Sequence, residues 1–130
     1  MARVGSEFFQ EWSPEIIVPV PLHPKRLRWR GFNQALLLGR EVSRRWQIPV
    51  DPFILLRVKE TAPQTQLPEE ERRKNVRRAF DVNSGKTIDG KNVLLVDDVY
   101  TSGATVNECS HTLLRAGAKE VHVLTLARAV

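Results

Sequence analysis

Residues 93–105 read VLLVDDVYTSGAT, and this stretch decides the fold. It opens with four apolar residues, 93–96, the pattern of a strand that is buried on both faces. Two carboxylates, Asp97 and Asp98, follow at once, and a loop of small residues and hydroxyls then leads toward a helix. Strands buried on both faces occur in parallel sheets that helices cover, so this stretch predicts an α/β fold.

The segments on either side of this stretch supply further strands and helices. Apolar residues have the spacing of strands at residues 16–20, 53–58 and 121–126, and that of helices at residues 32–46 and 106–116, the second helix ending at Gly117. Strands that alternate with helices pair in parallel through right-handed crossovers. We therefore predict a three-layer, Rossmann-like parallel sheet in one domain spanning residues 1–130.

Composition and charge exclude several classes of protein. The chain has 130 residues, 42% of them hydrophobic, and no run approaches the roughly 20 apolar residues of a membrane span. The first residues lack the pattern of a secretory signal, and the single cysteine, Cys109, can form neither an internal disulfide nor a cysteine zinc site alone. We therefore expect a globular cytoplasmic protein, with Cys109 packed in the core.

The net charge of +5 and pI near 9.9 indicate an anionic partner, either nucleic acid or a phosphorylated small molecule. Basic side chains gather in two segments that have the character of loops. They are Lys25, Arg26, Arg28 and Arg30 in the first segment, and Arg72, Arg73, Lys74, Arg77 and Arg78 in the second. A solvated surface and an anion-binding site are both consistent with such runs.

The residues after the central strand have the chemistry of a phosphate and sugar site. In a parallel sheet the ligand lies beyond the carboxyl ends of the strands, where Asp97 and Asp98 are expected. Residues 101–105 offer backbone amides and hydroxyls at a helix N-terminus, which hold a phosphate, and the carboxylates can accept hydrogen bonds from vicinal sugar hydroxyls or help to hold Mg²⁺ through water. The alternative is an ordinary capped helix. The combination favours a phosphorylated ribose.

Residues 93–105 resemble the signature with which type I phosphoribosyltransferases bind 5-phosphoribosyl-1-pyrophosphate (PRPP). Further segments resemble the competence protein F (ComF) family, so that the likeness spans residues 16–128. These segments are VPVPL at 18–22, RGFNQA at 30–35, QL at 66–67, ERRKNV at 71–76, AF at 79–80 and LTLAR at 124–128.

The resemblance implies a role for each matching residue. Asp97 and Asp98 would contact the ribose 2- and 3-hydroxyls and act on Mg²⁺ indirectly, through water or those hydroxyls. The 5-phosphate would be held by Thr101, Ser102, Gly103, Ala104 and Thr105. Lys25 and Arg26 would lie in the pyrophosphate loop. The catalytic residues would be Asp97 and Asp98 together with Arg72, Arg73 and Lys74, which belong to the flexible catalytic loop or hairpin of the fold.

Two functions follow from the resemblance. The first is Mg²⁺-dependent PRPP binding with transfer of the pentosyl group, as in glycosyltransferases, or PRPP sensing without turnover. The second is non-catalytic handling of single-stranded DNA, because the family is associated with DNA uptake in competence. A homodimer or competence-machinery partners would fit either one. The zinc segment that precedes the first strand in the family is absent from this sequence, as expected of a fragment or of a naturally short member.

Overall fold

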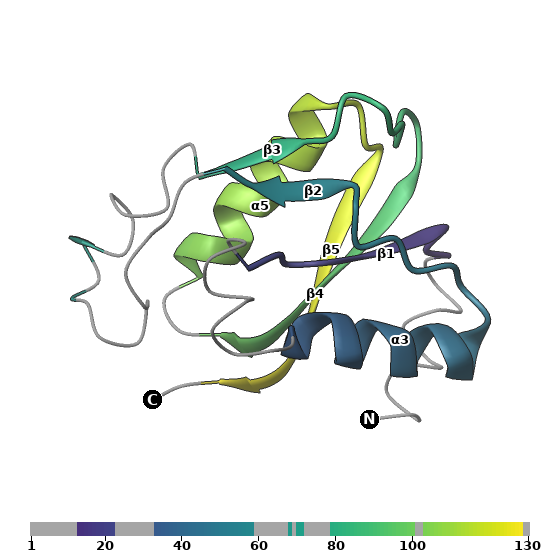
Figure 1. Cartoon of the computed structure of the whole chain (residues 1–130), viewed down its shortest axis with the longest axis horizontal. Helices are drawn as coiled ribbons and strands as arrows, with labels where there is room; N and C mark the ends of the chain where they lie inside the picture. Colours follow the sequence, from purple (N-terminus) through teal and green to yellow (C-terminus); the bar gives the residue numbers. More distant parts are fainter. Residues whose placement is uncertain are drawn as a thin grey trace.

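The computed structural model describes residues 13–22, 33–58, 68, 70–71, 79–100 and 103–128, and gives residues 98–100 and 126–128 by their backbone alone. The described residues form strands and helices in the arrangement shown in Figure 1. They are β1 (Ile16–Pro19), α3 (Gln34–Trp46), β2 (Leu55–Arg57), β3 (Phe80–Val82), β4 (Asn92–Tyr100), α5 (Ala104–Arg115) and β5 (Glu120–Arg128).

The central sheet has the strand order β1-β4-β5, and all of its pairs are parallel. Ile17 of β1 lies opposite Leu94 of β4, and Leu95 of β4 lies opposite Val123 of β5. This confirms the predicted parallel α/β sheet and its strands near residues 16–20, 93–96 and 121–126.

Side chains of β1 and β4 alternate between two cores, because successive strand residues point to opposite faces. Val93 and Leu95 belong to a cluster with residues of α5, whereas Leu94 and Val96 pack with Val42 of α3. In Figure 1, α3 lies on one side of the sheet and α5, with β2 and β3, on the other. The predicted three layers are therefore present.

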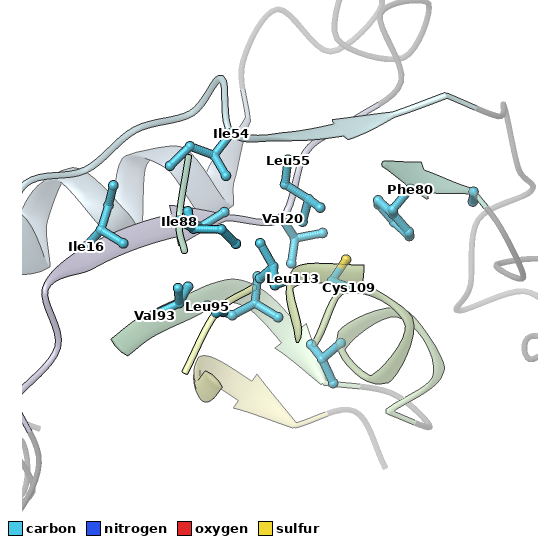
Figure 2. Packing of buried hydrophobic residues seen from close by; sticks show 14 of the residues in the cluster. Ile16, Val20, Ile54, Leu55, Phe80, Ile88, Val93, Leu95, Cys109 and Leu113 are labelled. Atoms are coloured by element: carbon cyan, nitrogen blue, oxygen red, sulfur yellow. The ribbon is translucent and has the colours of Figure 1, made fainter. Parts of the chain in front are cut away.

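Within the predicted strand 53–58, residues 55–57 form β2, but this strand does not pair as predicted. β2 joins β3 in a separate antiparallel sheet instead of the parallel one. Leu55 is buried and Leu56 is 38% exposed, so this short sheet covers the core with one face only. Leu55 and Phe80 of this short sheet, with the adjacent Ile54, pack over the face of the central sheet that carries α5. Cys109 and Leu113 of α5 belong to the same cluster (Figure 2).

The helices begin and end at residues with distinctive backbone conformations. Asn33 caps α3 by accepting hydrogen bonds from the amides of Ala35 (2.9 Å) and Leu36 (3.4 Å). α5 lies between two glycines with positive φ, Gly103 (83°) and Gly117 (108°). Cys109 on this helix is fully buried, which confirms its predicted place in the core. Within the described residues, neither α3 nor α5 has the length and the apolar character of a membrane-spanning helix.

Candidate functional site

The candidate site lies at the edge of the sheet where β1 and β4 end. The two strands are parallel, so their carboxyl ends meet at the same edge, and the amide of Val20 donates a hydrogen bond to the carbonyl of Val96 (2.8 Å). Beyond this bond the chain continues into Asp97 on one side and into Pro21 and Leu22 on the other. Ligands of open parallel sheets bind at this edge.

β4 extends further than residues 93–96, which corrects the predicted end of this strand. It continues to Tyr100, and its partner β5 pairs with it over the same length: Asp97 lies opposite Thr125 and Tyr100 opposite Arg128. Asp97 and Asp98 are therefore residues of the strand itself. The pairs Asp97–Thr125 and Val99–Ala127, on either side of Asp98, hold this part of the strand in a fixed register.

Asp97 is half-buried and lies on the α5 side of the sheet, because it follows Val93 and Leu95 in the strand alternation. Its charge reaches the adjoining core of α5. Burial, first, and the Asp97 carboxylate, second, raise the pKa of the Cys109 thiol well above its ordinary value. Asp97 and α5 therefore lie on the same face of the sheet.

The N-terminus of α5 forms the second part of the site. Gly103 precedes the helix in the left-handed conformation, and its carbonyl accepts the amide of Asn107 at 2.8 Å. Gly103 and Ala104 are buried and Thr105 is half-buried. The first turn of α5 contains no acidic residue. The partial positive charge of the helix N-terminus is thus left to act on an anion.

Asn33 is a site residue whose importance the sequence did not reveal. Besides capping α3, its side-chain amide donates a hydrogen bond to the carbonyl of Val20 (3.1 Å). An asparagine just before a helical pattern is an N-cap signal that could have been noticed. The bond to Val20 spans thirteen positions of the chain and has no local signal.

The other predicted site residues lie outside the described residues. They are Lys25, Arg26, Arg72, Arg73, Lys74, Thr101 and Ser102, and for Asp98 the structure gives the backbone alone. The structure places Asp97 near the carboxyl end of β4, and Gly103, Ala104 and Thr105 at the N-terminus of α5. Among the residues that the structure describes, no three His, Cys, Asp or Glu side chains gather closely enough to hold a metal ion by themselves.

Comparisons with known proteins place these features in context. Residues 33–129 match the family model of the phosphoribosyl transferase domain. The chain is 44% identical to competence protein F of Haemophilus influenzae over 117 residues, 89% of this chain and 51% of that protein. It is 39% identical to the DNA utilization protein YhgH of Escherichia coli K12 over 115 residues, 88% of this chain and 50% of that protein.

A third curated relative is competence protein ComFC of Streptococcus pneumoniae, 34% identical over 123 residues, which cover 95% of this chain and 52% of that protein. The chain thus spans about half the length of the curated relatives it matches.

Solved structures share the fold. A purine phosphoribosyltransferase from Pyrococcus horikoshii superposes with a TM-score of 0.59 at 20% identity, covering 97% of this chain and 68% of that one. TT1426 from Thermus thermophilus superposes with a TM-score of 0.52 at 15% identity, covering 97% of this chain and 80% of that one. The fold is therefore the one predicted from residues 93–105, that of type I phosphoribosyltransferases.

Proposed function

Because the chain belongs to the phosphoribosyl transferase domain family, and within it to the competence protein F group, we propose that it binds PRPP, or another ribose 5-phosphate, together with Mg²⁺. One observation carries this proposal. The half-buried carboxylate of Asp97 lies near the carboxyl end of β4, the strand that precedes α5 in the chain. The first turn of α5 carries no acidic residue.

This arrangement suits the two ends of a phosphorylated ribose. Carboxylate oxygens accept hydrogen bonds, so Asp97, with Asp98 beside it, takes the 2- and 3-hydroxyls of the sugar. The 5-phosphate lies at the N-terminus of α5, where the helix dipole favours negative charge. Gly103 fits this role because its conformation, φ 83°, is one that glycine adopts without steric cost.

Mg²⁺ fits the oxygen donors of the site. It keeps several waters and binds through one or two carboxylates plus phosphate oxygens, so Asp97 and Asp98 would hold it through water or through the ribose hydroxyls. When bound, the ion neutralises charge on the pyrophosphate. The half-buried position of Asp97 provides a fixed carboxylate at the sugar and leaves most of the coordination to ligand and water.

Transfer of the pentosyl group would break the bond between ribose C1 and a pyrophosphate oxygen and form one between C1 and the acceptor nucleophile. Positive charge develops on the sugar and negative charge on the leaving pyrophosphate. Carboxylates at Asp97 and Asp98 stabilise the first. The cations predicted for the second are Lys25, Arg26, Arg72, Arg73 and Lys74. We propose this enzymatic activity, of the glycosyltransferase class, as the use to which the binding site is put.

The binding proposal is tested by calorimetry with PRPP and Mg²⁺. We expect binding by the wild-type chain and its loss in the double variant Asp97→Asn with Asp98→Asn. The matched control is Asp81→Asn with Asp89→Asn, which removes the same charge from two exposed positions away from the sheet edge and should bind like the wild type. Unchanged PRPP binding in the variant with both Asp97→Asn and Asp98→Asn would refute the proposal.

Turnover is tested separately, by pyrophosphate release from PRPP and Mg²⁺ in the presence of a panel of bases and amines. Release that depends on one acceptor identifies a transferase and its acceptor. Binding without release from any member of the panel identifies a PRPP sensor and contradicts the enzymatic proposal.

A second function, handling of single-stranded DNA during uptake, is favoured by the net charge of +5 and by relatives named for competence and DNA utilization. Aromatic residues make up 7% of the chain, so strand binding would be mainly electrostatic. We expect affinity for a labelled oligonucleotide to fall steeply between about 50 and 200 mM salt, because neutralised phosphates release counterions. A flat salt response, or no binding at low salt, would exclude this function.

A further inference from the structure

Arg57 forms a cation–π contact at the end of the β2–β3 sheet. It is the last residue of β2 and lies opposite Phe80, the first residue of β3. Its guanidinium carbon, Cζ, lies 5.1 Å from the centroid of the Phe80 ring. Immediately beyond this pair, the amide of Val58 donates a hydrogen bond to the carbonyl of Ala79 (2.7 Å). Ring, strand pairing and hydrogen bond together fix a half-buried cation in one place.

This fixed cation lies over the same core as the candidate site. Phe80 and Cys109 belong to one buried cluster, and Figure 2 shows both side chains in it, Phe80 from β3 and Cys109 from α5. Burial is the main cause that raises the pKa of the Cys109 thiol. The charge of Asp97, on β4, raises this pKa further, and the charge of Arg57, on β2, lowers it. Asp97 follows Leu95 on the face of β4 that packs into this same cluster. Arg57, held on the Phe80 ring, and Asp97 therefore border one core.

α5, β5 and β1 also border this part of the sheet. From α5, Glu108 acts on the same thiol with the sign of a carboxylate, and it lies 3.9 Å from Arg115. From β5, the residue opposite Asp97 is Thr125, which is uncharged. From β1, the residue opposite the adjacent Val96 is Pro19. Charges that border an apolar core are screened less than charges in water, so a cation and a carboxylate at this core attract each other more strongly than on an exposed surface.

We propose that Arg57 is a positioning residue for Asp97: its guanidinium, held on the Phe80 ring, keeps the Asp97 carboxylate in the place where it meets the ligand. The role toward ligand rests on the proposed PRPP site, whereas the coupling between the two side chains is a property of the protein alone. Nothing in the signature at residues 93–105 points to β2 as a part of the site. On this proposal, the β2–β3 sheet contributes a residue to the site from outside the central parallel sheet.

The coupling is tested without ligand by a double-mutant cycle in urea unfolding, using the wild type, Arg57→Met, Asp97→Asn and the double variant. Met keeps an apolar stem of similar length and removes the charge. We expect the effects on the unfolding equilibrium constant to depart from additivity by at least about threefold, as for side chains that interact. Additive effects would overturn the proposal. If Arg57→Met fails to fold, Arg57→Gln takes its place in the cycle.

The role toward ligand is tested by calorimetry with PRPP and Mg²⁺. We expect Arg57→Met to weaken binding about tenfold and Arg57→Lys to recover part of that loss, because Lys keeps the charge without the planar stack. The control is Arg44→Met, which removes an exposed arginine that pairs with Glu41 at 2.6 Å on α3 and should leave affinity unchanged.

The two experiments separate failure of this inference from failure of the proposed function. A wild-type chain that binds no PRPP but shows a coupled cycle refutes the proposed ligand and leaves the pairing of Arg57 with Asp97 supported. A wild-type chain that binds PRPP, with Arg57→Met binding equally well, refutes the positioning role.

Discussion

The side chain of Asn33 donates a hydrogen bond to the backbone carbonyl of Val20 (3.1 Å) and accepts one from the amide of Ala35 (2.9 Å). One residue thus joins the end of the segment that carries β1 to the start of α3. Residues 21–32 begin and end at points that this bond fixes relative to each other. The relative position of Val20 and Asn33 is therefore set by this bond itself.

The two bonds of Asn33 can be separated by substitution. Asn33→Ser keeps an oxygen for the cap but is too short to reach Val20, and we expect it to lower the free energy of unfolding by about 1 kcal/mol. Asn33→Ala removes the cap as well and should cost about 1 kcal/mol more. Urea unfolding of the three proteins measures both steps. Equal losses in the two variants would show that the cap contributes nothing.

The two glycines at the ends of α5 should differ in function although both have positive φ. Gly103→Ala and Gly117→Ala each force a Cβ into the left-handed region, at a cost of roughly 1–2 kcal/mol in the free energy of unfolding. At Gly117 the new Cβ would also lie 2.5 Å from Oδ1 and 3.3 Å from Cα of Asp89, which adds to the loss. Thermal or urea unfolding measures these changes.

PRPP affinity distinguishes the same two glycines. Gly103→Ala should weaken binding, because this residue sets the start of the helix at the phosphate, whereas Gly117→Ala lies at the opposite end and should bind like the wild type. Gly85→Ala serves as the control for stability. Gly85 does not have a positive φ, and a Cβ added there would lie 3.7 Å from its nearest neighbouring atom, Oδ1 of Asn83. Equal affinity in the Gly103 and Gly117 variants would contradict the assignment of the phosphate to this end of α5.

The buried Cys109 thiol should make stability fall at high pH. Burial raises its pKa well above the ordinary value of 9.0, so the unfolded chain loses the thiol proton first and the native state keeps it. The unfolded state then binds fewer protons, and the free energy of unfolding falls as pH rises above 9.0, by up to about 1.4 kcal/mol per pH unit until the native thiol also ionises.

This effect is measured as the difference between the wild type and Cys109→Ala in urea unfolding from pH 7 to 10.5, which removes the contributions of Lys and Tyr common to both. We expect the wild type to lose stability relative to the variant only above pH 9.0. A difference that stays constant over the whole range would mean that the thiol ionises as easily in the folded chain as in the unfolded one.

The sequence predicted the elements whose signals are local. The apolar run at 93–96 gave the central strand, the helical spacing from 106 to 116 gave α5, and Gly117 its end, because periodicity and glycine conformations are read from neighbouring residues. The start of α5 at Ala104, within the signature, agrees with the helix expected after residues 101–105 for the same reason. A parallel sheet with helices on both faces follows from the alternation of these elements.

Features that depend on distant partners were not predicted. β3 is three residues long, with one buried side chain at Phe80, and it forms because β2 lies beside it. β4 reaches Tyr100 because β5 continues alongside to Arg128, although Asp97 and Asp98 are poor strand formers. The stacking of Arg57 on Phe80 joins residues from two strands in the same way. In each case tertiary pairing overrides local preference.

The register of β1 against β4 has a consequence for how the chain reaches this structure. Ile16 through Pro19 pair with Val93 through Val96. The ribosome therefore synthesises β1 long before its partner strand, β4. Until β4 is made, the side chains of β1, fully buried at Ile17 and Val18 in the finished fold, have no sheet to cover them. Pairing between such distant segments closes a large loop and slows folding. The nascent chain is therefore most prone to aggregation in the interval before β4 emerges from the ribosome.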